Sequence, residues 1–135
     1  MASVQVRYIV DDVGAAIGFY VERLGFTLQM HPAPAFAMLT RGDLRLVLSA
    51  PGPAPGGGQL SPEGKAPRPG GWNRFAIEVD DLGAWVAALQ AAGAGFRSGI
   101  VDGVGGRQAI VEDPSGNPVE LFEPKLPEAR LDRPA

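Results

Sequence analysis

Paired carboxylates occur twice in the chain, as Asp11-Asp12 and as Asp80-Asp81. Two adjacent carboxylates can divide a proton between them, so each pair is a candidate for acid–base chemistry. Each pair also stands between a strand-like and a helix-like segment, where a short carboxylate accepts hydrogen bonds from the free N–H groups of the first helical turn. We therefore predict that both pairs cap helices and do not form a catalytic site.

Other residue types that could do chemistry lack the surroundings they need. The only histidine, His31, precedes Pro32 at a strand end without a neighbouring carboxylate, so we predict an exposed loop residue and not a general base. The run Gly103-Val104-Gly105-Gly106 has no helix after it, unlike a phosphate-cradling loop. No serine stands in a Gly-x-Ser-x-Gly elbow, and the chain has no cysteine.

The elements that position these residues are repeated. The segment Val10–Ala15 recurs as Val79–Ala84 with the same Asp-Asp pair, and Leu46–Pro51 lines up with Val119–Pro124. We therefore predict a tandem copy of one unit of roughly fifty residues, in the order strand, helix and three strands.

Hydrophobic spacing and turn residues locate the elements of each copy. The first helix begins at Asp11 or Asp12 and ends at Gly25, and the second runs from Leu82 to Gly93. Prolines in His31–Pro34 predict the end of the second strand, because proline cannot donate to a ladder. The predicted strands are Val4–Val10, Phe26–Met30, Phe36–Thr40, Leu44–Ala50, Trp72–Val79, Phe96–Val101, Arg107–Glu112 and Val119–Glu123.

Composition divides the chain into four parts. Residues 1–51 form the first unit, 52–70 a linker rich in Pro and Gly, 71–124 the second unit and 125–135 a charged tail. A segment with so many Pro and Gly cannot bury much apolar surface, which favours a spacer. A lid over a pocket stays open as the alternative, because long loops in compact domains are often functional.

The bulk numbers describe an ordinary globular chain of 135 residues, with 45% hydrophobic and 20% charged residues. A net charge of −3 gives no reason to expect nucleic acid or an anionic membrane as partner. No apolar run reaches the ~18 residues of a membrane span, and the first residues do not form a secretory signal. We expect a cytoplasmic protein.

Two motifs of the chain are Phe19-Tyr20 with Leu24-Gly25-Phe26, and the run from Glu112-Asp113-Pro114-Ser115-Gly116-Asn117 to Leu121. With these motifs the chain resembles the vicinal oxygen chelate superfamily, which includes glyoxalases, bleomycin-resistance proteins and extradiol dioxygenases. The resemblance covers residues 4–124 and implies an α+β fold, in which tandem βαβββ units form curved mixed sheets around a pocket with helices outside. It also implies a homodimer.

The resemblance places metal ligands of the family at four positions, which are Gln5, Val47, Arg74 and Glu120 in this chain. Arginine stays protonated and valine has no donor atom, so these positions cannot supply the three or so protein ligands of a catalytic zinc site. We therefore expect no metal cofactor. The alternative is a divalent metal held by Glu120 and Gln5.

The same positions predict a ligand pocket. We expect Arg74 to pair with Glu120 where the family binds its metal, either as a structural ion pair or as a donor to a ligand. The residues predicted to bind ligand are Gln5, Arg7, Arg45, Val47, Trp72, Arg74, Glu120 and Phe122. We expect metal-independent binding of a small organic molecule. The alternative is a lyase, isomerase or dioxygenase that uses a metal or Glu120 as acid or base.

Overall fold

The computed structural model describes residues 4–53 and 56–131, and the chain divides into two compact units. The first unit runs to Gly70 and also contains Pro114–Asn117. The second unit begins at Gly71 and contains the remainder of the chain. Neither helix of the described residues has the length and apolarity needed to cross a membrane.

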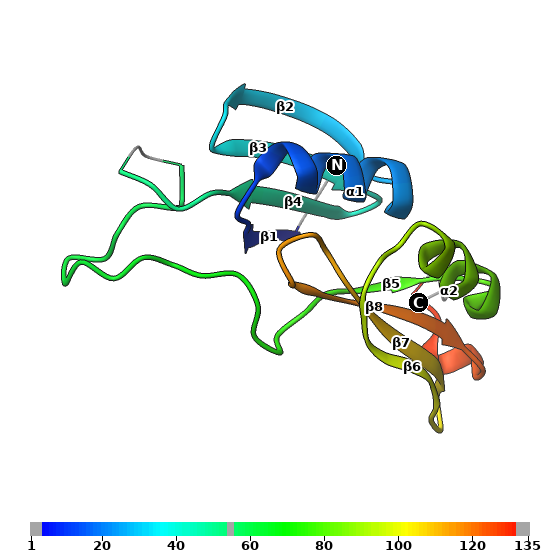
Figure 1. Cartoon of the computed structure of the whole chain (residues 1–135). Helices are drawn as coiled ribbons and strands as arrows, with labels where there is room; N and C mark the ends of the chain where they lie inside the picture. The colour runs from blue at the N-terminus through cyan, green and yellow to red at the C-terminus, as the bar shows by residue number, and fades with distance from the viewer. Residues whose placement is uncertain (1–3, 54–55, 132–135) are drawn as a thin grey trace. The chain divides into compact units, whose positions relative to one another are not determined.

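The first unit contains one helix and a four-stranded sheet (Figure 1). The strands lie in the order β1-β4-β3-β2, with β1 parallel to β4 and the other neighbours antiparallel. The elements are β1 (Val4–Ile9), α1 (Val13–Leu24), β2 (Thr27–Ala33), β3 (Phe36–Arg41) and β4 (Leu44–Ser49).

The second unit repeats this arrangement, with strand order β5-β8-β7-β6 and β5 parallel to β8. Its elements are β5 (Ala76–Glu78), α2 (Leu82–Ala91), β6 (Phe96–Asp102), β7 (Gly106–Glu112) and β8 (Pro118–Pro124), followed by the short 3₁₀ helix η1 (Pro127–Ala129). The predicted α+β class, with tandem βαβββ units, is confirmed.

Carboxylates and glycine set the ends of the helices as the sequence predicts. The Asp12 side chain accepts a hydrogen bond from Ala15 N at 3.1 Å, and Asp81 accepts one from Ala84 N at 3.0 Å. Gly25 ends α1 with a φ of 77°, a left-handed conformation that glycine adopts without strain. The second carboxylate of each pair, Asp12 or Asp81, therefore caps a helix.

Two predicted boundaries are wrong. The strand β2 continues through His31 and Pro32 to Ala33, whereas we expected it to end at Met30 and to leave His31 in a loop. β2 lies at the edge of its sheet and pairs only with β3, so Pro32 need not donate to a second neighbour. The strand β5 is also much shorter than the predicted Trp72–Val79.

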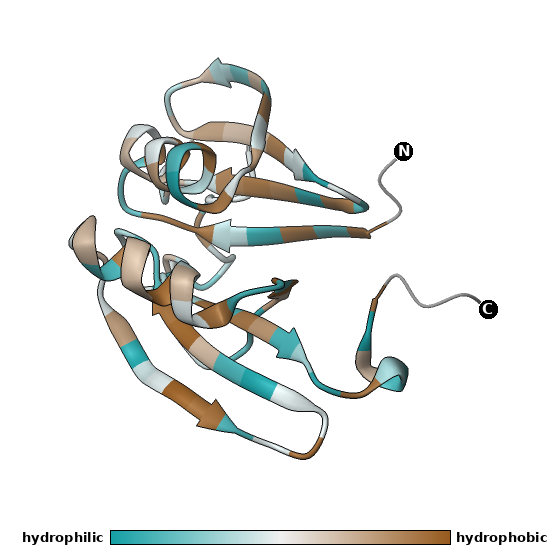
Figure 2. Cartoon of the chain, turned by 90° about the vertical axis from the view of Figure 1, so that its right-hand side faces the viewer, coloured by the Kyte–Doolittle hydropathy of each residue, from teal (hydrophilic) through white to brown (hydrophobic). Residues whose placement is uncertain are grey.

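Each sheet is covered by a helix on one face. α1 contacts β2, β3 and β4, while α2 contacts β6, β7 and β8. Side chains alternate between the two faces of a strand, which Figure 2 shows as alternating hydrophobic and hydrophilic bands. The helix-facing positions that are fully buried include Leu39, Leu46, Leu48, Val111, Val119 and Leu121. The opposite positions form what we term the open face of each sheet.

The turn between β7 and β8 completes the first unit. The Asn117 side chain, 4% exposed, donates to Ile9 O at 2.7 Å and accepts from Gly70 N at 2.7 Å. The nearby Ser115 Oγ accepts a hydrogen bond from Asp11 N at 2.8 Å. The turn thus supplies hydrogen-bond partners for backbone groups at the end of β1 and at Gly70.

We expect Asn117→Ala to lower the free energy of unfolding by about 1–3 kcal/mol, because it leaves a part-buried carbonyl and a part-buried N–H without this partner. Urea denaturation measures the change. The matched control is Asn73→Ala, which removes an exposed side chain and should change stability by less than about 0.5 kcal/mol. Equal effects of the two substitutions would contradict this role for Asn117.

Candidate functional site

The open face of the second sheet carries Glu120 and Phe122, two of the predicted site residues of that unit. Strand pairing sets Ile110 beside Glu120 and Gln108 beside Phe122. Because alternate residues share a face, these four side chains lie on the side away from α2. The face therefore combines a carboxylate, an amide and apolar side chains.

Arg74 and Glu120 form the ion pair that we expected. Arg74 Nε lies 3.0 Å and Nη2 2.9 Å from the same oxygen, Glu120 Oε1. Arg74 Nη1 also donates to Trp72 O at 3.3 Å, so the guanidinium joins β8 to the segment before β5. No described residue donates to Glu120 Oε2. Arg74 therefore anchors the carboxylate and leaves one oxygen able to accept a hydrogen bond.

Trp72 is held against a second arginine. The Arg97 guanidinium carbon lies 4.7 Å from the centre of the indole ring, within range of a cation–π interaction. Arg97 is itself fixed, because its Nε donates to Glu112 Oε2 at 2.9 Å and its Nη1 donates to Gly71 O. Trp72 as a whole residue is nevertheless 70% exposed. One ring face is thus covered by a cation while most of the side chain meets solvent.

A hollow of about 220 Å³, open to solvent, lies near the β6–β7 hairpin. Its lining residues are Val101, Gly103, Gly105, Gly106, Gln108 and Phe122. A side chain at Gly106 would come within 2.2 Å of Glu123 O, so glycine permits the close approach of the hairpin to β8. The glycine run that we interpreted as a strand connection therefore shapes this hollow, at the Phe122 end of the open face.

The other four predicted binding residues lie in the first unit. The register of β1 and β4 sets Gln5 beside Arg45 and Arg7 beside Val47, all on the open face of the first sheet. Gly57 lies so close to the Arg7 guanidinium that a side chain there would meet Arg7 Nε at 2.4 Å. The predicted site residues thus form two groups, one in each unit.

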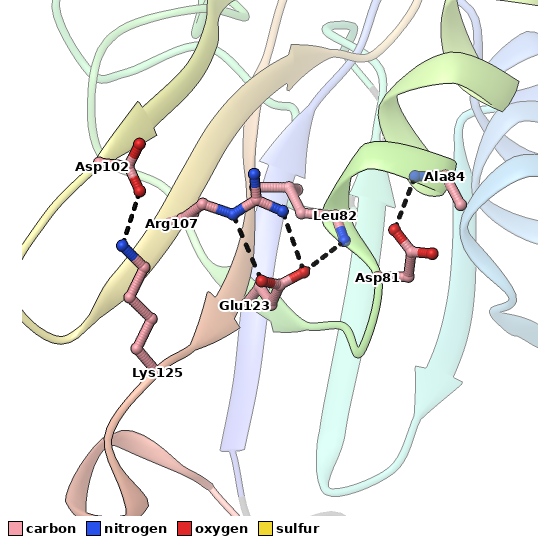
Figure 3. A network of polar contacts seen from close by, with 7 residues as sticks. All are labelled: Asp81, Leu82, Ala84, Asp102, Arg107, Glu123 and Lys125. Atoms are coloured by element: carbon pink, nitrogen blue, oxygen red, sulfur yellow. Dashed lines mark hydrogen bonds and ion pairs between the residues drawn. The ribbon is translucent and has the colours of Figure 1, made fainter.

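Polar contacts of the second unit connect the start of α2 and the ends of β6, β7 and β8 (Figure 3). Glu123 accepts a hydrogen bond from Leu82 N at 2.9 Å and pairs with Arg107 at 3.3 Å, while Lys125 pairs with Asp102 at 2.7 Å. Two neighbours lower the pKa of the Glu123 carboxyl. The larger effect comes from the hydrogen bond of the Leu82 N–H, and the next from Arg107. A strand carboxylate therefore supplements Asp81 at the start of α2.

The residues at the family's metal positions do not fit a divalent ion. In the first unit Gln5 and Val47 offer a single amide oxygen, and in the second unit Arg74 is a cation that already occupies Glu120. Within residues 4–53 and 56–131, no three His, Asp or Glu side chains gather as a metal cluster. We derive no chemistry through a metal at these positions.

Sequence reasoning missed Arg97 and Glu112, which hold Trp72 in place. Arg97 lies where β6 and β7 change register, so simple alternation does not show which face it joins. The opposite charges of Arg97 and Glu112 on neighbouring strands were the available signal.

The two βαβββ units, each with an open sheet face, define the class of protein. Residues 3–121 match the sequence model of the Glyoxalase/Bleomycin resistance protein/Dioxygenase superfamily, so the chain belongs to that superfamily.

Three solved structures illustrate the similarity. TnmS3, an antibiotic binding protein from Streptomyces sp. CB03234, is 29% identical, with 93% of this chain and 98% of that chain covered and a TM-score of 0.67. TioX from Micromonospora sp. ML1 is 22% identical, with 91% and 98% covered and a TM-score of 0.72. A lactoylglutathione lyase from Agrobacterium tumefaciens is 22% identical, with 90% and 92% covered and a TM-score of 0.68.

We expect Glu123→Gln to lower the melting temperature at neutral pH and to have little effect in acid. A carboxyl with a lowered folded-state pKa stabilises the fold above its ordinary pKa of 4.5, and this stabilisation disappears as the pH falls through the lowered value. Thermal unfolding from pH 7 downward measures the difference, with exposed Glu128→Gln as control. A constant difference at every pH would show that charge is not the cause.

Proposed function

We propose that the protein binds a small planar organic molecule on the open face of the second sheet, without a metal, by stacking it on Trp72. The proposal includes a homodimer in the cytoplasm as the binding form. The observation that carries the proposal is the exposed indole, which Arg97 holds from one side.

Holding an indole in place reduces the conformational entropy that a ligand must remove when it stacks. Arg97 cannot turn freely, because Glu112 and Gly71 accept its hydrogen bonds. The Trp72 backbone is held as well, because its carbonyl accepts a hydrogen bond from Arg74. The ring thus offers an aromatic ligand a surface that needs little rearrangement on binding.

Polar and apolar groups on the same face would orient the ligand. Glu120 Oε2 can accept a hydrogen bond from a hydroxyl or amine, since Arg74 uses only Oε1. Phe122 and Gln108 border the hollow and can receive a substituent. An apolar surface with a few fixed polar groups is the usual composition of a small-molecule site.

One relative above 25% identity supports binding. TnmS3, which is similar along nearly its whole length, is an antibiotic binding protein. In this chain Nε and Nη2 of Arg74 both contact Glu120 Oε1. This arrangement fixes the carboxylate in position more than it favours the uptake of a proton by a general base. The enzymatic alternative, whether with a metal or with Glu120 alone, has no comparable geometric support.

We expect small planar aromatic compounds, such as neutral anthraquinones, to quench Trp72 fluorescence. The chain contains two tryptophans, so Trp85→Phe leaves Trp72 as the only reporter. Trp72→Ala should weaken binding about tenfold in calorimetry, because it removes the stacking surface. Affinity that is unchanged in Trp72→Ala, or that disappears with EDTA, would overturn the proposal.

We expect Arg74→Ala to weaken the same binding while the fold is kept. The substitution frees the Trp72 carbonyl and the Glu120 carboxylate, whereas a partly exposed ion pair contributes only about 0–1 kcal/mol to stability. Calorimetry with the quenching compound and thermal unfolding measure the two effects separately. Unchanged affinity with a lowered melting temperature would show that the pair is only a structural staple.

A further inference from the structure

The chain that follows β4 turns back onto the end of the first sheet. Gly52 N donates a hydrogen bond to Gly58 O at 3.0 Å, which joins the two ends of a short loop. Ser49 Oγ, at the end of β4, donates to Gly56 O at 2.6 Å. These two bonds hold backbone carbonyls of a run of three glycines beside the strand end, and we call residues 56–58 the glycine latch.

Glycine is required in the latch because the contacts are too close for a side chain. A Cβ atom at Gly58 would lie 2.0 Å from Ala50 O, a backbone atom that cannot turn aside. A Cβ atom at Gly57 would lie 2.4 Å from Arg7 Nε, and Gly57 has a φ of 92°, which other residues rarely adopt. The latch therefore fits this part of the unit only as a run of glycines.

The latch covers the last pair of open-face positions on β3 and β4. Phe36 and Ser49 are partners in the register of these strands. Gly56 lies against the Phe36 side chain, since a Cβ atom there would be 3.7 Å from Phe36 Cβ. Ser49 is fully buried, and its hydroxyl has the Gly56 carbonyl as acceptor. The closed latch thus removes contact surface from Phe36 and supplies a partner for a buried hydroxyl.

The latch is held more weakly than the strands beside it. Its glycines have no side chains that could bury apolar surface, and fixing a glycine costs more conformational entropy than fixing any other residue. The strands are held by regular ladders and by the buried side chains of Leu46 and Leu48. Segments with few buried apolar contacts open at a lower free energy than core strands. We therefore expect the latch to open while the strands stay paired.

The equivalent point of the second unit is built differently. Pro51 and Pro124 hold the same position in the repeat, but after Pro124 the chain bonds to the β6–β7 hairpin, through Lys125 N and Gly105 O at 2.8 Å. The glycine that approaches the last strand closely there is Gly106, which belongs to β7 and pairs with Pro124 in the sheet. The latch is therefore an addition to the repeated unit and not a part that every such sheet needs.

We propose that the glycine latch is an intramolecular cover, which opens without unfolding of the first sheet and controls access to Phe36 and Arg7. In the closed state its backbone occupies the surface of Phe36 and restricts the Arg7 guanidinium. A molecule that contacts these side chains must displace the latch, so its apparent affinity is proportional to the fraction of chains in which the latch is open. This device is independent of the function proposed for Trp72.

The first test measures amide hydrogen exchange by NMR on the full chain, at the Gly52 N–H that bonds the latch. Gly58→Ala should accelerate this exchange at least about tenfold, because the added methyl group has no room in the closed state. Ser49→Ala removes one hydrogen bond to the latch without adding bulk and should accelerate it about fivefold. The amide of Leu46, in the middle of β4, should exchange at its original rate in both variants.

The second test measures access to Phe36 with the neutral nitroxide TEMPOL, which broadens NMR signals of side chains that it can reach. We expect stronger broadening of the Phe36 ring signals in Gly57→Ala than in the parent chain. The matched control is Gly64→Ala, because Gly64 has a similar φ of 85° but no atom within 4 Å of the added methyl group. This control should leave both the Phe36 broadening and the Gly52 exchange unchanged.

Three results would overturn the proposal. In the parent chain, Gly52 exchange as slow as that of Leu46 would show that the latch opens only when the sheet unfolds. Acceleration of both amides to the same extent in Gly58→Ala would show general loss of structure. Faster Gly52 exchange without stronger broadening of Phe36 would show that the loop opens but does not cover the face.

Discussion

Each unit has one helix for two sheet faces, and this imbalance governs the rest of the structure. The helix covers one face of four strands and buries the apolar residues there, among them Leu39 and Leu121. The opposite positions on the same strands have no helix to pack against, so they need not be apolar. Alternation therefore separates the chain into residues that stabilise the fold and residues, such as Arg45 and Glu120, that remain for recognition.

The fold was predictable because local signals and the repeat agree. Asp12 and Asp81 cap their helices, and Gly25 ends the first helix in the conformation that favours glycine. Each of these is a local interaction, which the identities of a few neighbouring residues determine. The error at Pro32 arose because the effect of proline depends on whether its strand is central or at an edge, and that is a property of the whole sheet.

Contacts of the candidate site were predictable only where the resemblance to the family indicated which distant residues lie close together. Arg74 and Glu120 were paired by that resemblance and lie 2.9 Å apart. The support of Trp72 by Arg97 depends instead on a register shift between β6 and β7, which no periodic pattern in the sequence reveals. Sequence alternation therefore predicts which residues share a face more reliably than it predicts which of them touch.

The first compact unit includes a short segment from the second half of the sequence. Asn117 follows most of the second repeat in the sequence, yet its amide bonds Ile9 and Gly70 in the first unit. During synthesis, these two backbone groups therefore lack that partner until the last strand of the second repeat is about to emerge. A fragment that ends at Gly70 does not contain Asn117. The first sequence repeat is therefore not a structural unit that is complete by itself.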